Sequence, residues 1–306
     1  MRAMLARSVK AGLEASGHYL RRLRAGRFPG IAVLCYHGVR PDGLRPGAAT
    51  FEALHVTAAE LEGHCRLLRA ACDPIGLDAW RAALRGGPPL PPRPVLVTFD
   101  DGYRSVLTVA RPILARHGIP AVAFVCSDPA REQRLLWYDA LARARGERAV
   151  EPWKSAPYGE WRAACARLAG PASEEDPNAP LTPALIHALA TGGDVEVGGH
   201  TAGHPILARA DLADQRREIL DNKHALEEWT GRPVRAFAYP NGRPGVDYTP
   251  ATAGLLAELG FDMAFTTRHG WAGPAEPALE RSRFLMLAGI SSAELAHRLA
   301  YSWRRA

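Results

Sequence analysis

Short apolar runs alternate with amphipathic segments along most of the chain. The apolar runs are rich in valine and phenylalanine, which is typical of strands buried on both faces of a sheet. The segments between them carry apolar residues at helical spacing. Alternating strands and helices predict an α/β fold with a parallel sheet, either open or closed into a barrel. The predicted strands are 31–36, 95–99, 121–125, 195–198, 234–239 and 263–267, and the predicted helices are 57–70, 104–116, 182–191, 211–230, 251–259 and 292–301.

Two stretches interrupt this alternation. The proline-rich stretch 88–94 is a stiff connector that leads into the strand at 95. Residues 128–180 contain helix-like and turn-rich sequences but no convincing strand. We interpret them as an insertion of roughly 50 residues between two strand–helix units, because a compact domain rarely contains so long a connection without a function. A lid or a wall of a substrate site is the role that such a position favours.

The segment 1–27 carries Leu5, Val9, Leu13 and Leu20 at roughly helical spacing, with basic residues between them. A basic amphipathic helix is typical of a segment that lies on an anionic membrane surface. A helix that docks on its own domain has the same pattern, and both interpretations stay open. The segment has no apolar run long enough for a signal peptide or a membrane span. We therefore expect a cytoplasmic protein, with peripheral contact at the inner face of the membrane as one alternative.

Composition excludes several classes of protein. The chain has 306 residues, of which 47% are hydrophobic and 23% charged, so most of it is not disordered. Its formal net charge is +6, nearly all of the positive charge is arginine, and no basic stripe alternates with aromatic residues. Nucleic acid is therefore not an expected partner. Five cysteines without a CxxC pair argue against a disulfide framework and against a cysteine zinc site.

Two adjacent carboxylates, Asp100 and Asp101, follow the predicted strand 95–99 in the sequence TFDDG. The carboxyl ends of parallel strands carry the active site in α/β folds. Adjacent side chains point in different directions as the chain turns, and Gly102 permits a tight turn. The alternative is an Asx-turn that caps the following helix.

His200 and His204 follow the strand 195–198 in the sequence HTAGH. Two histidines four residues apart on one helical turn can share one metal ion. Thr201 occupies the place where the HExxH motif of zincins has its glutamate. A histidine pair can also occur by chance among eleven histidines. Combined with a strand-end aspartate, however, the pair predicts a two-histidine, one-carboxylate metal site with open positions.

TFDDG followed by H-[ST]-x-x-H resembles the polysaccharide deacetylase family, the carbohydrate esterases of family 4 type that are built on the NodB homology domain. The sequences CYHGV (35–39), FAYPNG (237–242) and RSRFLM (281–286) fall in the order of that family. The resemblance implies a distorted (β/α)7 barrel over 28–306, with the insertion 128–180 beside the site and the basic segment 1–27 in front of it.

The resemblance also implies roles for individual residues. Asp101, His200 and His204 would bind a divalent metal, usually Zn²⁺, and Asp100 would be the general base. The backbone N–H near Asn241 would help to hold the oxyanion. The implied reaction is metal-dependent hydrolysis of an N-acetyl group from an amino sugar, in a glycoconjugate or its cytoplasmic precursor, with release of acetate. The implied partner is therefore an N-acetylated carbohydrate.

The sequence departs from the family pattern at two places. Ala238 stands where the common third motif has an arginine that orients the base; Arg283 could supply that charge, or it could be a solvated arginine at a strand end. The Leu-x-His motif that supplies the general acid is absent. His37 is the best candidate for this role by position, its alternative being a buried histidine bonded to backbone. His269 is a weaker candidate, with exposure in a loop as its alternative.

Further alternatives follow from these departures. Asp139, next to Trp137 and Tyr138, could line a sugar site, or the aromatic pair could be core packing. The chain could be a catalytically impaired, metal-containing carbohydrate-binding relic. The same site could also remove a formyl or an O-acetyl group, or open a small cyclic amide. Asp100 favours catalysis, because a protein that only binds sugar needs no unligated carboxylate beside its metal.

Overall fold

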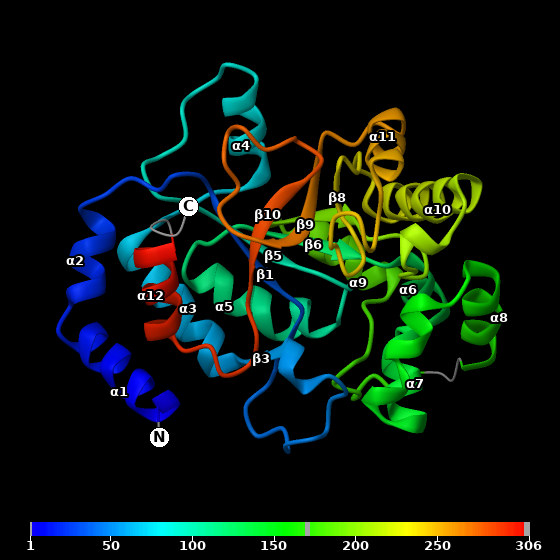
Figure 1. Cartoon of the computed structure of the whole chain (residues 1–306), viewed down its shortest axis with the longest axis horizontal. Helices are drawn as coiled ribbons and strands as arrows, with labels where there is room; N and C mark the ends of the chain where they lie inside the picture. Colours follow the sequence, from blue (N-terminus) through cyan, green and yellow to red (C-terminus); the bar gives the residue numbers. More distant parts are fainter. Residues whose placement is uncertain (1, 169–171, 303–306) are drawn as a thin grey trace.

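The computed structural model describes residues 2–168 and 172–302, and in this part of the chain seven parallel strands close into a barrel (Figure 1). The order around the ring is β1-β10-β9-β8-β7-β6-β5, and β5 pairs again with β1. The predicted seven-stranded barrel is thereby confirmed. The strands of the ring are β1 (Ala32–Tyr36), β5 (Pro94–Phe99), β6 (Ala121–Val125), β7 (Val195–Gly199), β8 (Ala236–Ala238), β9 (Met263–His269) and β10 (Arg281–Leu285).

The ring is irregular on one side. β8 has only three residues, where the sequence predicts a strand over 234–239, and the pairing of β10 with β9 shifts register between Arg281 and Arg283. A short β4 (Asp73–Pro74) pairs with the start of β5, and β2 (Gly38–Arg40) and β3 (His55–Thr57) form a separate parallel pair. These irregularities account for the distortion of the barrel.

Alternate residues along the strands enter two separate cores, as the period of two in a strand requires. Val33, Leu96, Phe124 and Phe265 belong to the smaller core, together with Trp80 of α4. The opposite strand faces pack against the surrounding helices in the larger core. Those helices are α3 (Ala58–Ala71), α5 (Arg111–Arg116), α9 (Pro183–Thr191), α10 (Leu212–Thr230), α11 (Pro250–Glu258) and α12 (Ser292–Tyr301), whereas α4 (Leu77–Leu84) packs Leu77 and Trp80 into the smaller core.

The N-terminal segment forms two helices where the sequence predicts one. α1 (Arg2–Ala15) and α2 (His18–Arg24) are separated at Gly17, which has a left-handed φ of 70°. Both helices lie against α12 (Figure 1). Tyr19 is buried there and its hydroxyl lies 3.1 Å from Nδ1 of His297. The segment is thus docked on the barrel domain, and its contact with a membrane stays a prediction. None of the helices in the described residues has both the length and the apolar character of a membrane span.

The insertion follows β6 and lies on the opposite side of the molecule from α1 and α2 (Figure 1). Its helices surround a small core of their own, to which Trp137, Tyr158 and Trp161 contribute. No named strand occurs among the described residues between β6 and β7. The insertion consists of α6 (Ser127–Glu132), α7 (Trp137–Arg145), the 3-10 helices Glu147–Ala149 and Glu151–Ser155, and α8 (Tyr158–Leu168).

Candidate metal centre and catalytic carboxylates

The two adjacent aspartates diverge at the carboxyl end of β5. The Asp100 N–H still donates to the Tyr36 carbonyl of β1, at 2.9 Å, so Asp100 continues the sheet. Asp101 and Gly102 then adopt left-handed φ values of 75° and 83°. A Cβ at position 102 would meet Cγ1 of Val125 at 2.7 Å, so only glycine fits this turn. The turn separates the two carboxylates and gives each a different set of neighbours.

Asp101 meets both histidines of the second motif. Its Oδ1 lies 3.3 Å from Nε2 of His200 and 3.4 Å from Nε2 of His204. All three side chains are buried. The histidines do not lie on a helical turn, as the spacing predicted, but on a loop in which Thr201 and His204 have left-handed φ values of 66° and 65°. The left-handed residues of this loop, and not a helical turn, therefore bring the two rings together.

The chemistry of these three side chains fits a divalent cation. Nδ1 of His200 donates to the Ala238 carbonyl at 2.7 Å, so in the neutral ring Nε2 carries a lone pair that faces Asp101 Oδ1. Two acceptors face each other there, and a cation between them removes the repulsion. Oδ2 of Asp101 is buried without a hydrogen-bond partner among the described residues. Two imidazoles and one carboxylate are a common ligand set for Zn²⁺ and other divalent transition metals.

Charge around Asp101 favours its ionised form. Burial raises the pKa of this carboxyl, but the imidazoles of His37, His200 and His204, when protonated, outweigh that effect and hold the pKa well below its usual range. An ionised carboxylate is the state that a metal ligand needs.

Asp100 is held by an arginine of β10, which is separated from β5 only by β1 in the ring. Arg283 in β10 donates from Nη1 to Oδ1 and from Nη2 to Oδ2 of Asp100, each at 2.7 Å, and from Nε to the Thr266 carbonyl at 2.8 Å. Only 1% of Arg283 is exposed, so the alternative of a solvated arginine is wrong. Burial raises the pKa of Asp100, but the Arg283 guanidinium outweighs it and brings that pKa below its usual value.

The turn after β8 offers a backbone donor. Asn241 has a left-handed φ of 56°, and its carbonyl accepts from the Thr267 hydroxyl at 2.6 Å. No group among the described residues accepts a hydrogen bond from the Asn241 N–H. Ala238 contributes its carbonyl to His200, as described above, while its methyl group lies in the barrel core.

The two candidate proton donors, His37 and His269, lie in different parts of the structure. Nε2 of His37 lies 4.0 Å from Oδ2 of Asp101, and its Nδ1 is buried with no partner in the described part of the chain. The alternative of a backbone-bonded histidine therefore finds no support. His269 lies at the end of β9, where it is exposed, as its alternative predicted, and its ring contacts Phe284 with centroids 5.0 Å apart. The structure thus brings His37 to the candidate metal centre.

Comparison with known families decides the classification. Residues 87–264 match the family model for polysaccharide deacetylase. The chain belongs to the polysaccharide deacetylase family. A poly-beta-1,6-N-acetyl-D-glucosamine N-deacetylase of Escherichia coli K12 is 35% identical to this deacetylase-family chain over 94 residues, which are 30% of the chain. The chain spans only 13% of the length of that relative.

Two solved structures share the fold of this polysaccharide deacetylase family member. The deacetylase PplD of Streptococcus pyogenes, solved in complex with acetate, has a TM-score of 0.65 at 21% identity and covers 89% of this chain and 99% of its own. IcaB from Ammonifex degensii has a TM-score of 0.63 at 23% identity, with coverage of 90% and 98%. Their likeness covers most of this chain, and it establishes the fold.

Asp139 of this deacetylase-family chain does not line an open sugar site, and that alternative is wrong. The carboxyl is completely buried and accepts hydrogen bonds from Tyr103 at 2.8 Å, from Asn178 at 3.1 Å and from the Thr50 hydroxyl. Burial raises its pKa to about 8. The network ties α7 of the insertion to the end of β5 and to the loop before β3, because its members come from those segments.

Sequence reasoning missed two polar residues on α10. Glu218 and Asn222 are buried, and both bond the loop that carries the histidines. They are one helical turn apart on the apolar face of 211–230. Polar residues at core positions of an amphipathic helix are the signal that could have found them. The sequence alone does not say which loop they meet.

Proposed function

We propose that this protein is a metal-dependent N-deacetylase that hydrolyses the acetamide of an N-acetylated amino sugar in a polymer or glycoconjugate and releases acetate. The observation that carries the proposal is the division of labour between two adjacent carboxylates. Asp101 joins His200 and His204, whereas Asp100 stays outside that group and is held by Arg283. Hydrolysis needs both a cation site and a separate base, and this arrangement supplies them.

Asp101, His200 and His204 would hold the cation, and Zn²⁺ suits this donor set best. A divalent cation there supplies Lewis acidity, which polarises the acetamide carbonyl and makes water more acidic. The chain's own contribution is to fix the three ligands. The Ala238 carbonyl sets the tautomer and the orientation of His200, and the turn at Asp101 aims its carboxylate at both rings.

Asp100 is the proposed general base. Its pKa lies below the usual value, so the carboxylate is ionised at neutral pH and can take a proton from the attacking water. Each of its oxygens accepts one bond from Arg283, and Oδ2 also accepts from the Cys35 thiol at 3.4 Å, so Oδ1 keeps a second acceptor site. Arg283 therefore orients Asp100 without blocking it.

Asn241 and His37 are proposed to serve the later stages of the reaction. The free Asn241 N–H can donate to the oxygen on which negative charge develops, an effect typically worth about 3–4 kcal/mol. The leaving amine must gain a proton, because an amide nitrogen does not depart as an anion. His37 is the proposed donor, since it lies beside Asp101 and its Nδ1 has no partner among the described residues.

The proposed substrate class is a polymer of N-acetylglucosamine or a related amino sugar. Support comes from the membership in the polysaccharide deacetylase family and from the name of the Escherichia coli relative. A cytoplasmic precursor as substrate, a cytoplasmic location and contact of the N-terminal segment with an anionic membrane stay predictions.

Acetate release from N-acetylated amino-sugar oligosaccharides tests the proposal. We expect a chelator to abolish release and added Zn²⁺ to restore it. Asp100→Asn should bind Zn²⁺ as the wild type does while losing about 10²- to 10⁴-fold in rate. Release that continues in chelator, or loss of metal from Asp100→Asn, would contradict the assignment. N-formyl and O-acetyl sugars in parallel distinguish the other hydrolases, and metal binding without turnover on any of these substrates would identify the relic.

A further inference from the structure

The loop that carries both histidines rests on one helix. After β7 ends at Gly199, residues 200–204 run along α10, which presents Glu218 and Asn222 to them. Glu218 is 4% exposed and Asn222 is fully buried. Residues four apart lie on the same helix face, so the two side chains reach successive parts of the loop.

Asn222 fixes the His200 end of the loop to the barrel. Its Oδ1 accepts from the His200 N–H at 3.0 Å, and its Nδ2 donates to the Val125 carbonyl at 2.9 Å. Val125 is the last residue of β6, so this amide bridges the ends of two neighbouring strands.

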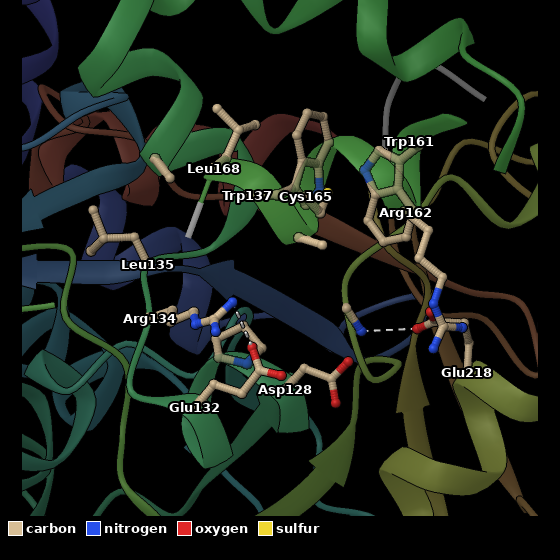
Figure 2. A pocket seen from close by; sticks show the side chains of 14 residues that line it. Asp128, Glu132, Arg134, Leu135, Trp137, Trp161, Arg162, Cys165, Leu168 and Glu218 are labelled. Carbon is tan, nitrogen blue, oxygen red and sulfur yellow. Dashed lines mark hydrogen bonds and ion pairs between the residues drawn. The ribbon is translucent and has the colours of Figure 1, made fainter. Parts of the chain in front are cut away.

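Glu218 fixes the other end of the loop and links it to the insertion. Its Oε2 accepts from the Gly203 N–H at 2.8 Å, and its backbone carbonyl accepts from the Ala202 N–H at 2.9 Å. Its Oε1 accepts from the Tyr158 hydroxyl of α8 at 2.6 Å. Glu218 lines a cavity of about 260 Å³. Figure 2 shows its carboxylate and the dashed line that joins it to the loop. The carboxylate therefore couples the insertion to the residue before His204.

The insertion also contacts His204 directly. The Trp137 indole N–H donates to the His204 carbonyl at 2.9 Å, and the Tyr138 ring meets the His204 ring edge-on with centroids 5.2 Å apart. His204 has a left-handed φ of 65°, which costs free energy for any residue with a side chain and persists only when neighbours enforce it. Nδ1 of His204 has no partner among the described residues, so the ring is placed by its backbone and by ring contacts rather than by a hydrogen bond at Nδ1.

We infer that Glu218, braced by Tyr158, is a positioning residue that places His204 and thereby sets the affinity of the Asp101–His200–His204 group for its cation. The inference rests on the proposed metal site. Removal of the carboxylate leaves the half-buried Gly203 N–H without its acceptor and removes one of the contacts that support the strained backbone at His204. Residues that orient metal ligands typically contribute 10- to 100-fold in metal affinity.

Zinc titration of the full-length, chelator-stripped protein against a competing chelator of known affinity tests this inference. Glu218→Ala should weaken Zn²⁺ binding about 10- to 100-fold. Glu218→Gln should stay close to the wild type, because the amide oxygen can accept from Gly203 while its NH₂ group turns to Tyr158. Tyr158→Phe, which removes one hydroxyl, should weaken binding less than Glu218→Ala does.

Gln215→Ala is the matched control. Gln215 lies one turn earlier on α10, is equally buried and bonds the Ala210 carbonyl and Thr252, but it does not touch residues 200–204. It should lower the melting temperature of the metal-free protein as Glu218→Ala does and leave Zn²⁺ affinity unchanged. Wild-type affinity in both Glu218→Ala and Tyr158→Phe, or an equal loss in Gln215→Ala, would overturn the inference. Zinc binding with these differences but without acetate release would overturn the proposed function alone.

Discussion

The barrel mouth and the insertion each bury an aspartate, and they stabilise it in opposite protonation states. Asp100, at the end of β5, receives the Arg283 guanidinium on both oxygens, and its pKa lies below the usual value. Asp139, in the insertion, receives hydroxyl and amide donors instead, and burial raises its pKa to about 8. The same side chain is therefore an ionised carboxylate in one region and a neutral hydrogen-bonding group in the other.

The two histidines are also held by different regions of the molecule. His200 is held by the barrel, through the Ala238 carbonyl on its ring and the Asn222 amide on its backbone. His204 is held by the insertion through Trp137 on its carbonyl, and the preceding residue Gly203 is held by Glu218 of α10, which Tyr158 of the insertion braces. We infer that the barrel provides the charged pair Asp100 and Arg283, whereas the insertion positions His204. The barrel side should therefore determine rate and pH dependence, and the insertion side should determine metal affinity and stability.

Arg283→Met should have the largest effect, because it removes the charge that keeps Asp100 ionised. We expect kcat/KM to fall by about 10²-fold or more, since a protonated Asp100 cannot act as base. The pKa of Asp100 should rise, so the acid limb of the pH–rate profile moves to higher pH. Arg283→Lys keeps the positive charge but loses the two parallel hydrogen bonds. Its kcat/KM should therefore lie between those of Arg283→Met and the wild type.

Pre-steady-state or steady-state acetate release from pH 5 to 9 measures this shift. Zn²⁺ affinity should change little in both variants, because Arg283 bonds Asp100 and not the three metal ligands. If the acid limb of the pH–rate profile stays in place in Arg283→Met, then Arg283 does not set the pKa of the catalytic base. That result would contradict the proposed difference between Asp100 and Asp139.

The strands and the strand-end motifs could be predicted from the sequence because they are local. Valine-rich runs mark buried strands, and Asp100, Asp101, His200 and His204 follow such runs directly. The barrel topology then brings the ends of those strands to one rim. The classification of these residues as a metal group therefore needed only their order along the chain and the resemblance to a family.

The supporting contacts could not be predicted because they join distant segments. Arg283 meets Asp100 across 183 residues, and nothing in RSRFLM distinguishes a buried guanidinium from a solvated one. The left-handed residues Thr201 and His204 depend on α10 and the insertion, so the spacing of the histidines indicated a helical turn that does not form. The burial of Asp139 likewise depends on Thr50, Tyr103 and Asn178.

Trp137→Phe tests the insertion side with an intermediate effect. Phenylalanine retains aromatic packing but loses the bond to the His204 carbonyl. One net hydrogen bond contributes about 0.5–1.5 kcal/mol, so we expect Zn²⁺ affinity to fall about two- to tenfold. The pH–rate profile should not move, because Asp100 and Arg283 are untouched. Trp153→Phe, in the same insertion, is the control and should bind Zn²⁺ as the wild type does. A shifted acid limb in Trp137→Phe would contradict the separation of the two regions.

Asp139→Asn should have the smallest effect on activity, because an amide resembles the protonated acid and Asp139 contacts none of the metal ligands. Its effect should appear in the pH dependence of stability. In the unfolded wild type the Asp139 carboxyl has a pKa near 3.8. In the folded protein the same carboxyl keeps its proton up to about pH 8. The folded state therefore binds more protons between these values, and the free energy of unfolding falls as pH rises, by at most about 1.4 kcal/mol per pH unit. Urea unfolding at pH 5, 6 and 7 should show a shallower decline in Asp139→Asn than in the wild type or in the exposed control Asp42→Asn. Equal slopes in all three would show that the insertion holds Asp139 ionised, as the barrel holds Asp100.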